Sequence, residues 1–227
     1  MPTMPAAIAA RAERWFGHPA TVTEVTVLSP GLRTVTMAGD ALRGRRYRPG
    51  DEIEFLVSER EFRHYTPSAY DPGTGTCSVV FQTHAGGPGS AWAAALKPGD
   101  PVSVMGPGGG VRFDPTVPAV LLGDATALGL FAALEASGTQ VSGAIEIPAE
   151  DTAAAATVVR SVEVVAASTL RSWVTAHGAE VAAAKSRVYA VGHAQTIQQL
   201  RTLLRESGVS RQSIVVKAYW ATGRTGL

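Results

Sequence analysis

Cysteine, net charge and long apolar runs are all scarce in this chain of 227 residues. Cys77 is the single cysteine, so the chain can form no internal disulfide and no thiolate metal cluster, and a reducing compartment fits this composition. The 20 basic and 19 acidic residues leave a net charge of +1, and neither half is markedly basic. We therefore expect no nucleic-acid partner.

Apolar stretches long enough for a membrane are also missing. The best candidate, residues 117–134, is interrupted by Gly123 and Asp124. Near the N-terminus, Arg11, Glu13 and Arg14 break the apolar run that a secretory signal needs. We expect a soluble, cytoplasmic protein without membrane insertion.

Several catalytic motifs are absent from the sequence. It contains no phosphate-binding G-x-x-x-x-G-K-S/T, no G-x-S-x-G, no H-E-x-x-H and no strict G-x-G-x-x-G. The five histidines show no ligand spacing, so we expect no metal site. These absences argue against hydrolases and metalloenzymes.

What is present is a globular composition, with 45% hydrophobic and 17% charged residues. In the first half, alternating runs at 21–28 and 32–37 flank a Ser29-Pro30-Gly31 turn and predict an antiparallel pair. A helix is expected at 8–16, with Ile8, Trp15 and Phe16 as its packing candidates. Further strands are expected at 52–57, 63–66, 77–83 and 102–105. We predict an antiparallel six-stranded β-barrel over residues 1–116.

After Pro115 and Pro118, strands and helices alternate, which predicts βαβ units and a parallel sheet. Residues 149–157 read as a loop or a frayed helix. We predict a second, α/β domain over residues 117–227, with ligands bound between the barrel and the carboxyl ends of the parallel strands. The expected strands are 119–122, 141–147, 161–166, 187–191 and 214–219, and the expected helices are 127–136, 170–184 and 195–205.

The first motif that carries chemistry is Arg63-His64-Tyr65-Thr66. Alternation on a strand places Arg63 and Tyr65 on one face. A guanidinium can bind a pyrophosphate, an aromatic ring can pack on a ring system, and Thr66 can hydrogen-bond a heteroatom. The alternative is an ordinary surface pair of Arg63 and Tyr65.

The second motif is a glycine-rich turn, His84 to Trp92, that opens a short helix. The unpaired N–H groups at such a helix N-terminus suit the diphosphate of a dinucleotide. A tight connection also needs glycines for purely conformational reasons, so the turn alone decides nothing.

With these two motifs in order, the sequence resembles the siderophore-interacting proteins, which are FAD-binding ferric-siderophore reductases of the ferredoxin-reductase-like superfamily. The resemblance spans about residues 20–224. It continues through Pro98-Gly99-Asp100, Gly106-Pro107-Gly108-Gly109, Gly123-Asp124-Ala125-Thr126 and Lys217-Ala218-Tyr219-Trp220.

The resemblance implies FAD as the cofactor, NAD(P)H or ferredoxin as the electron donor, and a ferric siderophore as the substrate, whose reduction releases Fe(II). No side chain is then needed as a catalytic acid or base, because the flavin carries the redox chemistry. The implied FAD-binding residues are Arg63, Tyr65, Thr66, His84, Gly87, Gly89, Ser90 and Trp220. The implied donor-site residues are Gly123, Asp124 and Thr126.

Candidates for binding an anionic ferric chelate are Lys217, Arg46 and Arg48, the latter two within a run that also includes Arg43 and Arg45. Such a run is also typical of a solvated loop. Tyr219 and Trp220 have the alternative role of core aromatics that close a domain interface.

The sequence also departs from the family pattern. Ser68 stands where a second arginine is usual, Ala125 and His193 stand where glutamates are usual, and Ala221 follows Tyr-Trp in place of arginine. Two alternatives therefore remain open: a general flavin reductase or oxygenase reductase component, and a non-catalytic flavin- or siderophore-binding module.

Overall fold

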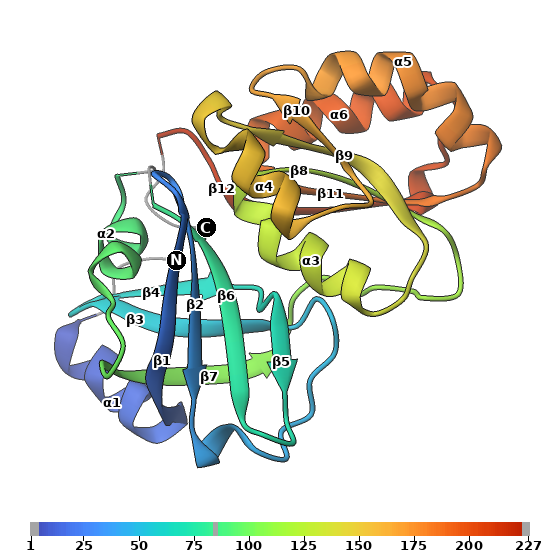
Figure 1. Cartoon of the computed structure of the whole chain (residues 1–227). Helices are drawn as coiled ribbons and strands as arrows, with labels where there is room; N and C mark the ends of the chain where they lie inside the picture. The colour runs from blue at the N-terminus through green and yellow to red at the C-terminus, as the bar shows by residue number, and fades with distance from the viewer. Residues whose placement is uncertain (1–4, 84–85, 224–227) are drawn as a thin grey trace. The chain divides into compact units, whose positions relative to one another are not determined.

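The structure is a computed structural model that describes residues 5–83 and 86–223. It divides into two compact units, Met1–Arg112 and Phe113–Leu227. The sequence placed this boundary at residue 116. The predicted fold class is confirmed: a curled antiparallel sheet comes first along the chain, and a parallel sheet with helices follows (Figure 1).

The N-terminal unit is built from one sheet and short helices. The sheet order is β4-β3-β7-β1-β2-β6-β5, with every pairing antiparallel. Its elements are α1 (Ala6–Phe16), β1 (Gly17–Ser29), β2 (Leu32–Ala38), a 3₁₀ turn (Asp40–Leu42), β3 (Glu52–Ser58), β4 (Glu61–Tyr65), β5 (Ala69–Asp71), β6 (Thr76–Gln82), α2 (Pro88–Ala95) and β7 (Pro101–Gly108).

The strand count corrects one detail of the prediction, since the sheet has seven strands and not six. The additional strand is β5, whose three residues pair with β6 from Ala69 opposite Ser78 to Asp71 opposite Thr76. Three residues are too few to show the alternation by which a strand is recognised in a sequence.

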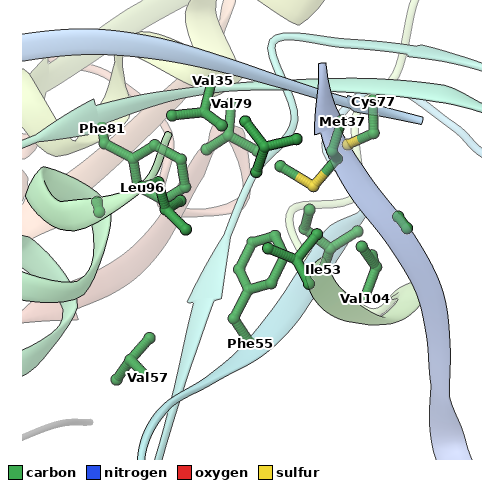
Figure 2. Close-up of a cluster of buried hydrophobic side chains, with 14 of the residues drawn as sticks. Val35, Met37, Ile53, Phe55, Val57, Cys77, Val79, Phe81, Leu96 and Val104 are labelled. Atoms are coloured by element: carbon green, nitrogen blue, oxygen red, sulfur yellow. The ribbon is translucent and has the colours of Figure 1, made fainter. Parts of the chain in front are cut away.

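Alternation along the strands creates the core of this unit. In β6, Cys77, Val79 and Phe81 are buried and the residues between them are partly exposed. Side chains from β2, β3 and β7 meet this row in the apolar interior that Figure 2 shows. The sheet therefore buries one face and leaves the other polar, as half-buried antiparallel strands do.

Helix α1 forms as predicted, but the prediction of its packing residues was wrong. Ile8, Trp15 and Phe16 are 55%, 61% and 63% exposed. The side chains that pack on the sheet are small ones, chiefly Ala9 against Phe62. A short helix with alanines on its inner face can approach the sheet closely, and the bulky residues then lie on its outer side.

The C-terminal unit is an α/β sandwich. Its elements are β8 (Ala119–Asp124), a 3₁₀ turn (Ala125–Ala127), α3 (Leu128–Ala136), β9 (Val141–Ile147), a 3₁₀ turn (Ala149–Asp151), α4 (Thr152–Val158), β10 (Glu163–Ala166), α5 (Leu170–Ala183), β11 (Arg187–His193), α6 (Ala194–Glu206), a 3₁₀ turn (Arg211–Ser213) and β12 (Ile214–Trp220). The segment predicted as a loop or frayed helix thus contains α4.

The five strands are parallel in the order β10-β9-β8-β11-β12. Central strand β8 is buried along five of its six residues, which explains its unbroken apolar sequence. Helices α5 and α6 lie side by side on one face, and α3 and α4 lie on the other (Figure 1). Among the residues that the structure describes, no helix has both the length and the apolar character to cross a membrane.

Candidate functional site

Strand β4 carries the first candidate motif in the N-terminal unit. Arg63 pairs across the sheet with Phe55 of β3, and Tyr65 pairs with Ile53. Both side chains are partly exposed, while Phe62 is buried on the opposite face. The expectation that Arg63 and Tyr65 share a face therefore matches the alternation of the strand.

Tyr65 is fixed by neighbouring aromatic rings. Its ring centroid lies 4.7 Å from that of Phe81, edge to face, and 5.9 Å from that of Phe55. Trp92 of α2 packs on the same group, 4.8 Å from Phe55. Burial raises the pKa of the Tyr65 phenol to about 12, although the nearby Arg63 guanidinium opposes the rise. Tyr65 is therefore a neutral hydroxyl at physiological pH, held in one orientation.

The Arg63 guanidinium has partners on its own strand. Nη2 lies 3.0 Å from Oε1 of Glu61, and Nη1 donates to the Phe62 carbonyl at 2.8 Å. The arginine and glutamate side chains are only 19% and 18% exposed. Sequence reasoning missed Glu61, although its position two residues before Arg63 on one strand was the signal that places both on one face.

The second motif forms the start of α2. Gly87 is the N-cap with extended backbone and Pro88 occupies the first turn. Because glycine has no side chain, the N-cap residue makes no capping hydrogen bond. The Ser90 hydroxyl donates to the Gln82 carbonyl at 3.1 Å, which ties the helix to the end of β6. The predicted short helix after a glycine-rich turn is confirmed, but His84 lies outside the described residues.

The two motifs meet at Gly89. A Cβ on Gly89 would lie 2.3 Å from the Tyr65 hydroxyl and 3.4 Å from Cγ of Arg63. Glycine is thus required for α2 to approach β4 this closely. The structure brings Arg63, Tyr65 and the N-terminus of α2 together.

This arrangement fits the diphosphate of a dinucleotide. The uncapped first turn of α2 offers backbone N–H groups, and the adjoining guanidinium has donors beyond the two that Glu61 and the Phe62 carbonyl engage. The aromatic ring of Tyr65 lies beside them. These groups supply positive charge, hydrogen-bond donors and an apolar surface, which are what a flavin dinucleotide needs.

Thr66 and Ser68 follow directly after β4. Thr66 is buried, with 8% exposure. At position 68, both the backbone N–H and the hydroxyl donate to the Ser78 carbonyl, at 2.8 and 3.1 Å. Ser68 therefore attaches the chain to β6. Because serine stands here in place of a second arginine, Arg63 is the single guanidinium of this motif.

Arg33 is a further residue that the sequence analysis did not single out. Its Nη1 donates to the carbonyls of Ala93 and Ala94 at 3.2 and 2.7 Å. A cation at the C-terminal end of a helix satisfies free carbonyls and complements the helix dipole. Arg33 on β2 thereby fixes α2, whose opposite end faces Arg63 and Tyr65.

The second cluster lies in the C-terminal unit, where β8, β11 and β12 end. One carboxylate oxygen of Asp124 accepts hydrogen bonds from the backbone N–H and the hydroxyl of Thr126. The other accepts from the His193 backbone N–H at 2.8 Å and from the Trp220 indole N–H at 2.9 Å. Asp124 therefore joins residues from three strand ends.

The His193 ring lies at the centre of this cluster. Its Nδ1 is 2.9 Å from the Thr196 hydroxyl and its Nε2 is 2.9 Å from the Thr222 hydroxyl. The ring stacks on Trp220 with centroids 4.2 Å apart and planes inclined by 28°. Trp220 is 43% exposed.

Glycines allow these strand ends to approach. At Gly192, with φ +116°, a Cβ would lie 2.5 Å from the Asp124 carboxylate. At Gly123 a Cβ would lie 3.0 Å from the Val191 carbonyl. Among the predicted donor-site residues, Gly123 thus allows β8 to pack closely against β11. The Asp124 carboxylate accepts hydrogen bonds from Thr126.

The predicted substrate-binding residues lie elsewhere. Arg46 and Arg48 are exposed in the loop before β3. Their neighbours are engaged, since Arg43 binds Asp40 and Arg45 donates to the Ala41 carbonyl and lies 2.9 Å from Nδ1 of His18. In the C-terminal unit, Lys217 and Tyr219 are partly buried on β12.

A cavity of about 420 Å³ also lies in the N-terminal unit, between α1 and the sheet. Glu13, Leu56 and Trp92 are among its lining residues, and Arg63 and Tyr65 are not. The cavity shares Trp92 with the aromatic group around Tyr65, but it does not reach the Arg63 and Tyr65 side chains.

Comparison with known proteins first defines a class. The chain has the two-domain fold of the ferredoxin reductases: a ferredoxin reductase of carbazole 1,9a-dioxygenase superposes with a TM-score of 0.73 at 19% identity, covering 90% of this chain and 69% of that one. A siderophore utilization protein from T. fusca gives a TM-score of 0.73 at 22% identity, covering 93% and 95% of the two chains.

Within this fold class, a family model matches part of the chain. The family model of the siderophore-interacting FAD-binding domain matches residues 58–111, a segment that holds both motifs of the N-terminal unit. The resemblance to the siderophore-interacting proteins is therefore confirmed, and the match lies in the FAD-binding segment of that family. It is also 34% identical over 128 residues to the mycobactin import ATP-binding/permease protein IrtA of Mycolicibacterium smegmatis, and these residues are 50% of this chain and 15% of that protein.

Proposed function

We propose that this protein is an FAD-dependent oxidoreductase that reduces a ferric siderophore. The observation that carries the proposal is the contact of α2 with β4 at Gly89, which gathers Arg63, Tyr65 and an uncapped helix N-terminus in one place. The match to the siderophore-interacting FAD-binding domain over the same residues supports it.

In this proposal each residue of the site has a stated role. Arg63 and the N–H groups of the first turn of α2 hold the diphosphate of FAD, and Gly87 and Gly89 keep side chains out of its way. Tyr65 packs on the flavin, and Thr66 hydrogen-bonds near it. When bound, FAD supplies the transfer between a two-electron donor and a one-electron acceptor.

The overall reaction balances with NAD(P)H as the donor. One NAD(P)H gives up a pair of electrons and releases a proton, and two ferric chelates each take one electron and become ferrous. Hard oxygen ligands hold Fe(II) much less tightly than Fe(III), so reduction loosens the metal. Arg46, Arg48 and Lys217 are the proposed contacts to an anionic chelate, and ferredoxin is the alternative donor.

The decisive experiment follows the colour of the purified protein without oxygen. We expect a yellow protein that bleaches on adding NADPH, NADH or reduced ferredoxin, and regains its colour on adding a ferric siderophore. An Fe(II) chelator added with the siderophore should report ferrous iron in step with the recovered colour. Stopped-flow measurements with each donor in turn identify the physiological one.

Other outcomes lead to other functions. Bleaching followed by recovery with free flavin or an oxygenase, and indifference to chelated iron, indicates a general flavin reductase. A yellow protein that no donor bleaches indicates a binding module without catalysis. Colourless protein that takes up no added FAD overturns the proposal.

A further inference from the structure

The indole of Trp220 is exposed, yet two contacts fix its orientation. Its N–H donates to Asp124 at 2.9 Å, and one ring face lies on the imidazole of His193. An exposed tryptophan normally keeps rotamer freedom, and fixing it has an entropic cost. A ring fixed at its edge and on one face offers its remaining surface as a rigid flat area.

His193 is itself fixed from several directions. Both ring nitrogens have hydroxyl partners, Thr196 in the first turn of α6 and Thr222 just after β12, each at 2.9 Å. Its backbone N–H donates to Asp124. The imidazole plane is therefore set before Trp220 packs on it.

The location of this pair points to a ligand. In α/β sheets, ligands bind beyond the carboxyl ends of the parallel strands, and Trp220 and His193 end β12 and β11. A rigid indole face at that edge suits stacking by a planar heteroaromatic ring.

We propose that His193 is a positioning residue that, together with Asp124, holds Trp220 as a stacking surface for the heteroaromatic ring of a redox cofactor or its donor. This rests on the proposed function for the identity of the ligand, but the positioning itself does not depend on it. The glutamate usual in the family at position 193 cannot stack, so this role belongs to the histidine of this chain.

The first test uses the protein without added ligand. The near-ultraviolet circular dichroism of the wild type minus that of Trp220→Phe isolates the signal of the fixed indole. The corresponding difference for His193→Gln is taken against the His193→Gln/Trp220→Phe double variant, and we expect the signal to be lost there. The far-ultraviolet spectrum and the melting temperature show that the fold is kept. His193→Phe, which retains a ring for stacking, should restore much of it.

The chain offers a matched control. Trp173 stacks on His177 with centroids 4.4 Å apart and planes inclined by 23°, within α5. His177→Gln should leave the Trp220 difference signal unchanged. A full Trp220 signal in His193→Gln overturns the proposal, because the indole would then need no imidazole behind it.

The second test adds ligand. Titration with FAD, and separately with NADP⁺ or NAD⁺, should quench the emission that Trp220→Phe lacks, and the nucleotide that does so identifies the ring. We expect His193→Gln to weaken that binding about tenfold and His193→Phe to recover most of it. Equal affinities in wild type and His193→Gln overturn the proposed role.

The two proposals can fail separately. If the wild type retains no flavin and reduces no chelate, the proposed function fails, yet the ligand-free spectra still decide whether His193 positions Trp220.

Discussion

Arg63 is held by its own strand before any ligand is considered. The contacts to Glu61 and to the Phe62 carbonyl orient the guanidinium at a position adjoining α2. A carboxylate so close also opposes an incoming anion, so the strength of diphosphate binding depends on how far the arginine charge exceeds what Glu61 neutralises.

The first prediction concerns this side chain. Arg63→Ala should weaken FAD binding by about 1.5 to 3 kcal/mol, because a charge-assisted hydrogen bond to the diphosphate is lost. Isothermal titration of the apoprotein with FAD measures it. His64→Ala is the matched control, since His64 lies on the other face of β4 and should leave affinity unchanged. Equal FAD affinity in Arg63→Ala and the wild type would mean that Arg63 serves only its ion pair.

At the scale of single residues, the sequence predicts which side chains share a face of a strand better than it predicts their hydrogen-bond partners. It predicted that Arg63 and Tyr65 share a face, because alternation is local. It did not predict that Asp124 binds His193 and Trp220, which lie 69 and 96 residues away in the chain. Such contacts depend on strand order, and alternation along single strands does not reveal that order.

Among the elements, α2 is positioned by contacts at both of its ends. Its N-terminal turn lies against β4 at Gly89, and Arg33 holds its other end. The position of the whole helix is therefore set by residues on two strands.

The second prediction tests that contact. Gly89→Ala should destabilise the N-terminal unit and weaken FAD binding severalfold, because a Cβ would lie 2.3 Å from the Tyr65 hydroxyl. Tyr65→Phe removes that oxygen and leaves the ring carbon Cζ at 3.6 Å, an ordinary contact. In denaturant unfolding, the double variant should therefore lose about 1 kcal/mol or more less free energy of unfolding than the sum of the losses of the two single variants. If the two substitutions have strictly additive effects on the free energy of unfolding, the strain in Gly89→Ala does not come from the Tyr65 hydroxyl.

Elements with strong periodicity were the predictable ones. Helix α6 buries Ile197, Leu200 and Leu204 at helical spacing, and the sequence alone indicates it. Strand β5 and helix α4 were missed or left open, because three residues and a run of alanines carry almost no pattern. Their existence follows from neighbours in space, such as β6 beside β5.

For the whole molecule, the main fact is that each compact unit has a hydrophobic core of its own. The N-terminal core includes Cys77, which is fully buried, and burial raises the pKa of its thiol to about 12. The Cys77 thiol therefore reports on the core of the N-terminal unit.

The third prediction follows from that pKa. Above about pH 9 the unfolded thiol ionises while the folded one keeps its proton, so the unfolded state binds fewer protons. The free energy of unfolding of the N-terminal unit should be fully present below pH 9 and fall by about 3 to 4 kcal/mol as pH rises toward 12. Thermal melts across this range, repeated with Cys77→Ala, measure the slope. An equally steep fall in Cys77→Ala would assign it to tyrosines such as Tyr65.

Asp124 accepts hydrogen bonds from two groups of Thr126, from His193 and from Trp220, which occupies both of its oxygens. In dinucleotide-binding folds an acidic side chain can recognise the adenosine ribose through its 2′-hydroxyl. A carboxylate engaged in this way has no acceptor left for that sugar. If a pyridine nucleotide is the donor, as proposed, discrimination between its phosphorylated and unphosphorylated forms must come from side chains other than this aspartate.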